Sequence, residues 1–108
     1  MPAFYQKVYR LLKKVPAGKV TTYKALAHTL GIRAYQAIGQ AMRNNPYAPR
    51  IPCHRVIKSD GTLGGFMGKT RGPAIEKKKK MLEKEGIKFA GDKVQNFPKT
   101  LHKFNNNT

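Results

Sequence analysis

The sequence predicts one small domain, mainly α-helical with short β elements, of the winged helix-turn-helix class. Three observations predict it. Apolar residues recur at helical spacing near the N-terminus, two short helical segments are joined by a turn that contains Gly31, and two short β-prone segments form a possible hairpin late in the chain. The last two features are typical of a helix-turn-helix with a hairpin wing. A chain of 108 residues is long enough for one such domain and too short for two.

Four helical segments are predicted. The first covers residues 4–14, where Phe4, Val8, Leu11 and Leu12 share one face, and Pro16 and Gly18 follow its end. After the β-prone residues 20–23, where a threonine can cap the next helix, the second covers 24–30 and the third 34–43. The fourth begins at Pro73 and ends before Gly86.

The rest of the chain is predicted as loops and short β elements. Residues 51–57 form an apolar run that we expect to be buried, and residues 63–68 form a glycine-rich loop. Residues 87–89 and 93–95 form the wing, and residues 105–108 are a disordered polar tail. The lysine run 77–80 is interpreted as a solvated face of the fourth helix.

The charge of the chain predicts a polyanionic partner. Lysine and arginine total 22 against five acidic residues, which gives a formal net charge of +17. Nucleic acid is the partner that such a charge favours. A lysine-rich thermophile surface is the alternative, but such surfaces usually balance lysine with glutamate, and this one does not. The chain lacks a signal peptide and an apolar run of about 20 residues, so we expect an intracellular protein without membrane contact.

Cys53 is the candidate nucleophile, because His54 and Arg55 follow it directly and a nearby base or cation turns a thiol into a reactive thiolate. Adjacent side chains of a strand point to opposite faces, so a turn after Pro52 or a bridging water is needed for His54 to take the proton. Of the five acidic residues, we favour Glu85 as the partner of the histidine. The alternative is a buried, inert cysteine.

A metal site is not expected, because one cysteine and three histidines show no paired ligand spacing. We expect no cofactor either.

Several motifs in the same order resemble one known family. Residues 51–56 (Ile-Pro-Cys-His-Arg-Val) are similar to the active-site signature of the O6-alkylguanine-DNA alkyltransferases. The segment 18–23, the helix end 37–46 and the Glu85-Gly86 helix terminus also match. The resemblance runs from about Phe4 to Phe89 and covers only the C-terminal, DNA-binding domain of that family.

The resemblance implies a winged-helix repair protein that flips O6-alkylguanine, chiefly O6-methylguanine, out of double-stranded DNA. Cys53 would take the alkyl group irreversibly, so each molecule would act once. His54 would accept the thiol proton through water, and Glu85 would polarise His54. Tyr23 would bind the base at N3 and help to protonate the leaving guanine, and Asn45 would shape the active-site turn.

The resemblance also implies contacts to the base and to DNA. The loop 63–68 would cover the base, with the Met67 N–H donating to O6. The expected substrate contacts are Arg55, Val56, Phe66, Met67 and Gly68. The expected DNA contacts are Arg33, Ala34, Tyr35, Gln36, Ala37, Gly39 and Arg43, with small residues on a recognition helix that enters the minor groove and Arg43 on a phosphate.

Two positions depart from the family pattern. Gln36 stands where the family usually has an arginine that fills the gap left by the flipped base. Gln36 can hydrogen-bond the orphaned cytosine, but it brings no charge. Either base flipping is weaker in this chain, or Tyr35 or Arg33 takes over. In the lid, Phe66-Met67 replaces an aromatic-plus-small pair, and about five extra residues follow, which leaves the range of adducts open.

Two alternative functions compete with alkyl transfer. Alkyltransferase-like proteins have this one-domain size, bind O6-alkylguanine and recruit other repair factors, but their pattern carries tryptophan where this chain has Cys53. A general winged-helix regulator with an incidental cysteine is the third reading. The leading prediction is a monomeric, single-turnover methyltransferase, cytoplasmic and nucleoid-associated in a prokaryote or nuclear in a eukaryote.

Overall fold

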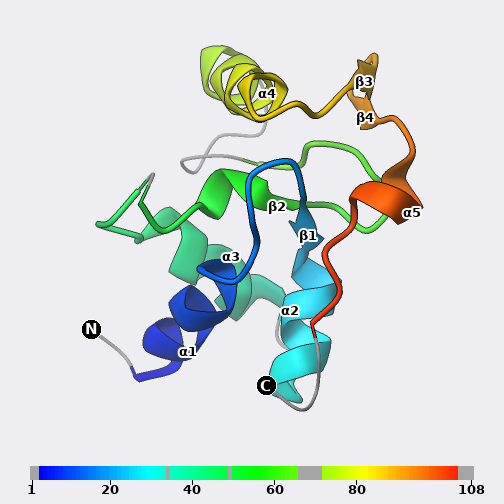
Figure 1. Ribbon diagram of the computed structural model, residues 1–108. Coiled ribbons are helices and arrows are strands. Elements are labelled where there is room, and N and C mark those ends of the chain that lie inside the picture. Colours follow the sequence, from blue (N-terminus) through cyan, green and yellow to red (C-terminus); the bar gives the residue numbers. More distant parts are fainter. Residues whose placement is uncertain (1–2, 34, 49, 66–71, 105–108) are drawn as a thin grey trace.

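Three helices form the N-terminal half of the protein (Figure 1). The computed structural model describes residues 3–33, 35–48, 50–65 and 72–104. Helices α1 (Ala3–Leu12), α2 (Tyr23–Leu30) and α3 (Tyr35–Arg43) pack on one another around a core. The residues of that core are Val8, Tyr9, Leu12, Leu26, Ala27, Ile38, Ala41, Ile51, Cys53 and Val56.

Local sequence signals set the ends of α2 and the turn to α3. The Thr22 side chain accepts a hydrogen bond of 2.9 Å from the Ala25 N–H, which caps the helix at its start. Gly31 ends it in the left-handed conformation, with φ 72°, which glycine adopts without a steric penalty. The helix-turn-helix predicted from the sequence is therefore present.

A two-stranded parallel sheet joins the first helices to the cysteine segment. Strand β1 (Thr21–Thr22) pairs with β2 (Val56–Ile57), so that Thr21 lies opposite Val56 and Thr22 opposite Ile57. A single 3₁₀ turn, Cys53–Arg55, leads into β2. This pairing of segments more than thirty residues apart was not predicted, because each strand has only two residues.

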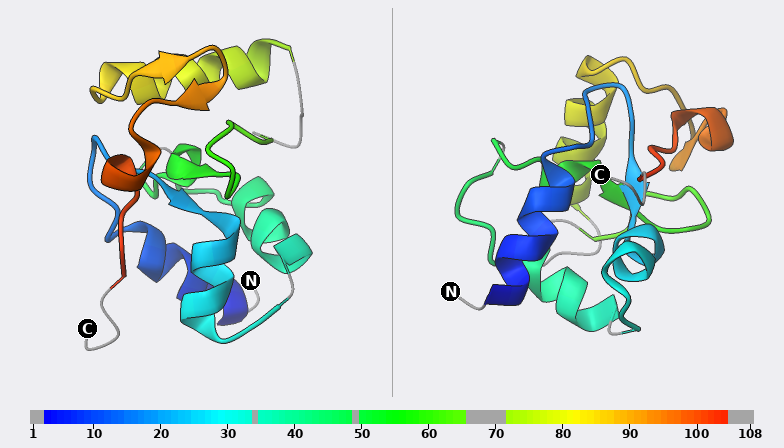
Figure 2. Two further views of the ribbon diagram at one scale, coloured as in Figure 1. Left: turned by 90° about the vertical axis from the view of Figure 1, so that its right-hand side faces the viewer. Right: turned by 60° about the horizontal axis from the view of Figure 1, so that its bottom comes forward.

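The C-terminal half covers the other side of this small sheet (Figure 2). It contains α4 (Pro73–Lys84), the antiparallel hairpin β3 (Phe89–Ala90) and β4 (Lys93–Val94), and the short helix α5 (Phe97–Thr100). A second core cluster of buried residues holds it in place: Val20, Ile57, Leu63, Leu82, Ile87 and Val94. The chain after α5 pairs with the residue before β1: Leu101 forms a parallel bridge with Val20, and the His102 N–H donates to Val20 O at 2.7 Å.

The observed class agrees with the prediction: mainly helical, with small sheets and a hairpin wing. The predicted helices differ by at most two residues at their ends, and α5 was missed. Residues 105–108, predicted as a tail, lie outside the described residues. Within the described ranges, no helix combines the length and apolar character needed to cross a membrane.

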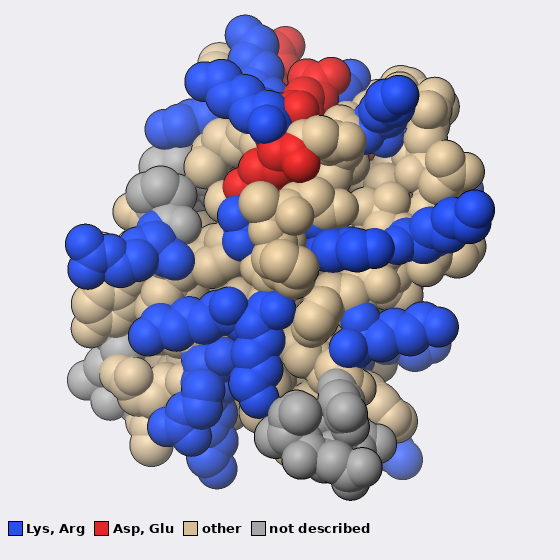
Figure 3. Space-filling model, in the orientation of Figure 1, with Lys and Arg blue, Asp and Glu red and all other residues tan. Residues whose placement is uncertain are grey.

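Charge is distributed unevenly over the two halves. Residues 1–59 contain no Asp or Glu, and all five acidic residues lie between Asp60 and Asp92. In Figure 3 the red side chains accordingly gather at the top, around α4, while the lower half of this face is blue and tan. The three-helix half is therefore the more attractive side for a polyanion.

Candidate active site

Cys53 lies at the start of the 3₁₀ turn, in the core cluster that also contains Ile38 and Ala41 of α3, and only 8% of its surface is exposed. Asn45, just beyond the end of α3, holds this position. Its Nδ2 donates to Ile51 O at 2.9 Å, and its Oδ1 accepts from the Tyr47 N–H at 2.9 Å. This side chain thus links the end of α3 to Ile51, two residues before the thiol.

His54 and Glu85 form a hydrogen-bonded pair beside the thiol. His54 Nε2 lies 2.8 Å from Glu85 Oε2, and His54 is 2% exposed. Because an ionised carboxylate only accepts hydrogen bonds, the proton of the neutral ring sits on Nε2. His54 Nδ1 is buried and has no hydrogen-bond partner, so its lone pair is available to accept a proton.

Arg55 holds the other side of Glu85. Its Nε donates to Glu85 Oε1 and its Nη2 to Oε2, both at 2.8 Å, while Nη1 donates to Val15 O at 2.7 Å. This two-pronged ion pair fixes the carboxylate that orients His54. The guanidinium thus positions Glu85, and the contact of Arg55 with the base stays a prediction.

The environment shifts the pKa values of Cys53 and His54 toward their neutral forms and that of Glu85 toward its charged form. Burial raises the pKa of the Cys53 thiol, against a hydrogen bond from Asn45 and the charge of Lys78, which lower it. Burial lowers the pKa of His54, against the hydrogen bond and charge of Glu85. Glu85 keeps a lowered pKa although desolvation raises it, because Arg55 and His54 both stabilise the carboxylate. Near neutral pH the site therefore holds a thiol, a neutral imidazole and a carboxylate.

Lys78 is the functional residue that sequence reasoning missed. The interpretation of residues 77–80 as a solvated face is wrong at this position: Lys78 is fully buried, whereas Lys77 and Lys80 are exposed. Its Nζ donates to Val56 O at 2.7 Å, Leu63 O at 2.6 Å and Gly65 O at 3.0 Å. Helical periodicity could have revealed this burial, because Lys78 and Leu82 are four residues apart and share the buried face of α4.

This buried lysine also acts on the thiol. Burial lowers the pKa of Lys78 to about 7, while the charge of a Cys53 thiolate raises it again. An ammonium at Lys78 reciprocally lowers the pKa of Cys53. Lys78 therefore links residues 63–65 to β2, and its positive charge favours the thiolate form of Cys53.

Tyr23 faces the same site from the start of α2. Burial raises the pKa of its hydroxyl, and the charge of Cys53 raises it further. Its side chain packs against the core cluster that contains Cys53. A side chain at Gly64 would lie 3.6 Å from Tyr23 Cε2 and 3.0 Å from Lys58 Cγ. Gly64, with φ 70°, thus lets the first part of the loop lie against the tyrosine.

The other predicted residues fall into three groups. Tyr35, Gln36 and Arg43 are exposed on α3, and Arg33 is exposed just before it. Ala37 and Gly39 are partly buried on α3, and Val56 is in the core, where only its carbonyl faces Lys78. Ala34, Phe66, Met67 and Gly68 lie outside the described residues.

Fold and site together define a class: a helix-turn-helix domain that carries a buried cysteine beside a histidine–glutamate pair. The chain belongs to the family of the 6-O-methylguanine DNA methyltransferase DNA-binding domain, whose family model matches residues 3–87. The family predicted from the cysteine segment is thereby confirmed.

Relatives and solved structures agree with this membership. A methylated-DNA–protein-cysteine methyltransferase of Sulfolobus acidocaldarius is 45% identical over 84 residues, which are 78% of this chain and 50% of the relative. Structures of the Atl protein of S. pombe in complex with DNA (TM-score 0.79, 32% identity, 96% of this chain and 98% of that one) and of Mycobacterium tuberculosis OGT in complex with DNA (TM-score 0.71, 34% identity, 80% and 50%) share its fold. The chain spans about half the length of the curated relatives it matches.

Proposed function

We propose that this protein repairs O6-alkylguanine in double-stranded DNA by transferring the alkyl group irreversibly to Cys53. The observation that carries the proposal is the arrangement around the thiol: a neutral His54 held by Glu85, and the buried Lys78, whose positive charge lowers the pKa of Cys53. An inert cysteine would need neither a base nor a cation.

The raised pKa of Cys53 keeps the side chain in its neutral thiol form until a substrate is bound. A buried neutral thiol reacts slowly with stray electrophiles. When an alkylated base occupies the site, His54 Nδ1 takes the thiol proton through a water molecule, and Glu85 stabilises the resulting imidazolium. Lys78 stabilises the thiolate in the same step.

The transfer step exchanges one bond for another. The Cys53 sulfur attacks the alkyl carbon, a carbon–sulfur bond forms, and the bond from that carbon to O6 breaks with its electron pair left on guanine. Tyr23 donates a proton to the leaving guanine at N3, and the proton that His54 took from the thiol returns through water to the Tyr23 phenolate, so that both side chains regain their starting forms. The products are a thioether at Cys53 and unmodified guanine, with no step that regenerates the thiol.

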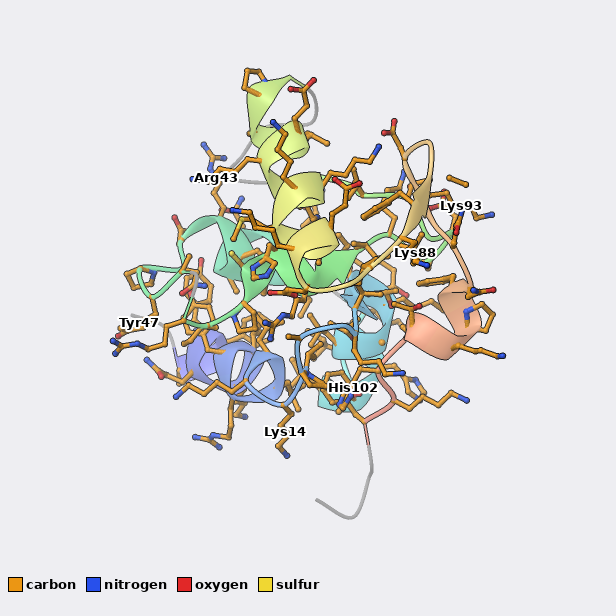
Figure 4. All side chains as sticks on the ribbon, turned by 45° about the horizontal axis from the view of Figure 1, so that its top comes forward. Lys14, Arg43, Tyr47, Lys88, Lys93 and His102 are labelled. Atoms are coloured by element: carbon orange, nitrogen blue, oxygen red, sulfur yellow. The ribbon has the colours of Figure 1, made fainter. Side chains whose placement is uncertain are left out.

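Helix α3 and the acid-free half of the chain supply the DNA-binding surface of this proposal. Where a side chain at Gly39 would lie, no atom comes within 4 Å, so a sugar–phosphate backbone can approach the helix there. Arg43 extends outward from the last turn of α3 (Figure 4). Binding is then expected to weaken steeply with salt, and a flat salt response would contradict this role of the charge.

Mass spectrometry tests the transfer directly. Incubation with a duplex that contains O6-methylguanine should add one methylene, about 14 Da, to the tryptic peptide of residues 51–55, which holds Cys53. A Cys53→Ser variant should bind the same duplex without accepting the group. Demethylation by that variant would show that the nucleophile is another residue.

A binding module without transfer is the second candidate. It is favoured by the similarity to the S. pombe Atl protein, which extends over 96% of this chain. If the lesion-containing duplex is bound tightly and the Cys53 peptide keeps its mass, this second function replaces the first.

A further inference from the structure

The outer face of α3 has a definite shape. Tyr35, Gly39 and Arg43 follow one another at intervals of four residues, so they lie along one line of the helix, about 12 Å long at about 1.5 Å per residue. The space beside Gly39 is open to a distance of 4 Å. Tyr35 therefore places an aromatic ring at one end of this line and Arg43 a cation at the other, with open space beside Gly39 between them.

Tyr35 is not among the buried residues that pack α3 against the core. Ile38 and Ala41 bury α3 against the core, whereas Tyr35 is 51% exposed. Tyr47 is the other large apolar residue among the exposed ones that the structure describes, and its ring packs edge to face on Tyr9 at 6.1 Å. That contact accounts for Tyr47, and no ring contact of this kind is found for Tyr35 in the described part of the chain.

The surroundings of Tyr35 are cationic. It borders a shallow groove of about 300 Å³ between α2 and α3, lined also by Lys24, His28, Gly31, Ile32 and Arg33. None of these carries a negative charge. An exposed aromatic ring next to a cation-lined groove is the combination by which proteins stack on bases while they hold the phosphates.

Extrusion of a base leaves a gap in the stack and an unpaired base opposite it. Minor-groove proteins insert apolar side chains between base steps, and aromatic side chains stack on bases of any sequence. We propose that Tyr35 inserts into the stack at the place that the alkylated guanine leaves. The neighbouring Gln36, neutral and exposed, then binds the unpaired base by its amide. This inference rests on the proposed function, because only a protein that extrudes a base creates the gap.

Comparison of two substrates tests the insertion. Single-turnover transfer to Cys53 is measured with an O6-methylguanine duplex and with the free base O6-methylguanine, which needs no extrusion. Tyr35→Ala should slow the reaction with the duplex about tenfold or more and leave the rate with the free base unchanged. Tyr35→Phe should stay near the wild-type rate, because the ring alone stacks. Tyr47→Ala, which removes the other exposed ring, should leave both rates near wild type.

The result that overturns the proposal is a Tyr35→Ala variant with the wild-type duplex rate, or one that loses both rates equally. A second measurement separates this failure from failure of the transfer itself. In the Cys53→Ser background, Tyr35→Ala should reduce the preference for the lesion-containing duplex over an unmodified duplex about tenfold. An unchanged preference for the lesion would exclude the insertion, and a reduced preference would support it. Both conclusions hold even if the wild-type protein never transfers the alkyl group.

Discussion

The buried lysine offers the most direct test of how this site is built. Lys78→Met replaces the ammonium by an uncharged side chain of similar length inside the same packing. Lys77→Met, one residue earlier and exposed, is the matched control. Both changes are best made in a Cys53→Ser background, so that the coupled thiol does not titrate in the same pH range.

The expected effect follows from the pKa of Lys78, which burial lowers from 10.5 to about 7. At about 1.4 kcal/mol per pKa unit, this difference corresponds to roughly 5 kcal/mol that opposes the buried ammonium. Between these two pH values the unfolded chain binds one more proton than the folded protein. The free energy of unfolding therefore rises with pH over this window, by roughly 3 kcal/mol from pH 6.5 to pH 9.5.

Urea unfolding followed by circular dichroism measures this rise. The wild-type side chain should gain roughly 3 kcal/mol of stability relative to Lys78→Met between pH 6.5 and pH 9.5, whereas its difference from Lys77→Met should stay constant. If the difference from Lys78→Met is the same at both pH values, burial does not destabilise the ammonium. Its three carbonyl contacts would then hold the pKa of Lys78 at its ordinary value.

Three further predictions concern the groups around the thiol. Glu85→Gln should lower the free energy of unfolding by about 2–4 kcal/mol at pH 7 through weakened charged hydrogen bonds. Because the folded-state pKa of Glu85 is lowered, this difference should shrink below about pH 4.5, and a constant difference in acid titrations would contradict it. Asn45→Ala should cost about 1–3 kcal/mol and raise the pKa of Cys53, seen as an upward shift in the pH profile of iodoacetamide labelling; Asn44→Ala, on the exposed neighbour, should leave that profile in place. Tyr23→Phe should slow methyl transfer about tenfold or more with stability unchanged within about 1 kcal/mol, and an unaltered transfer rate would exclude proton donation by Tyr23.

Much of the fold was predictable because its signals are local. The cap at Thr22, the left-handed turn at Gly31 and the proline that begins α4 each depend on a few neighbouring residues. The parallel pairing of β1 with β2 carries no such signal. Two strands of two residues each contain no periodicity, and only the packing of the helices brings them together.

The candidate site divides in the same way. The reactive residue types and the class of partner are readable from Cys53 with His54 and from a net charge of +17, because composition and adjacency are properties of the chain itself. The choice of Glu85 among five acids rested on its place at a helix end, and the structure places it 2.8 Å from His54. Tertiary structure alone decided that Arg55 grips that carboxylate and that Lys78, inside a run of four lysines, is buried against three carbonyl oxygens. The physical reason is that the environment of a charged side chain depends on what the folded chain places around it. Two lysines on opposite faces of one helix have the same sequence context, but one is surrounded by water and the other by protein.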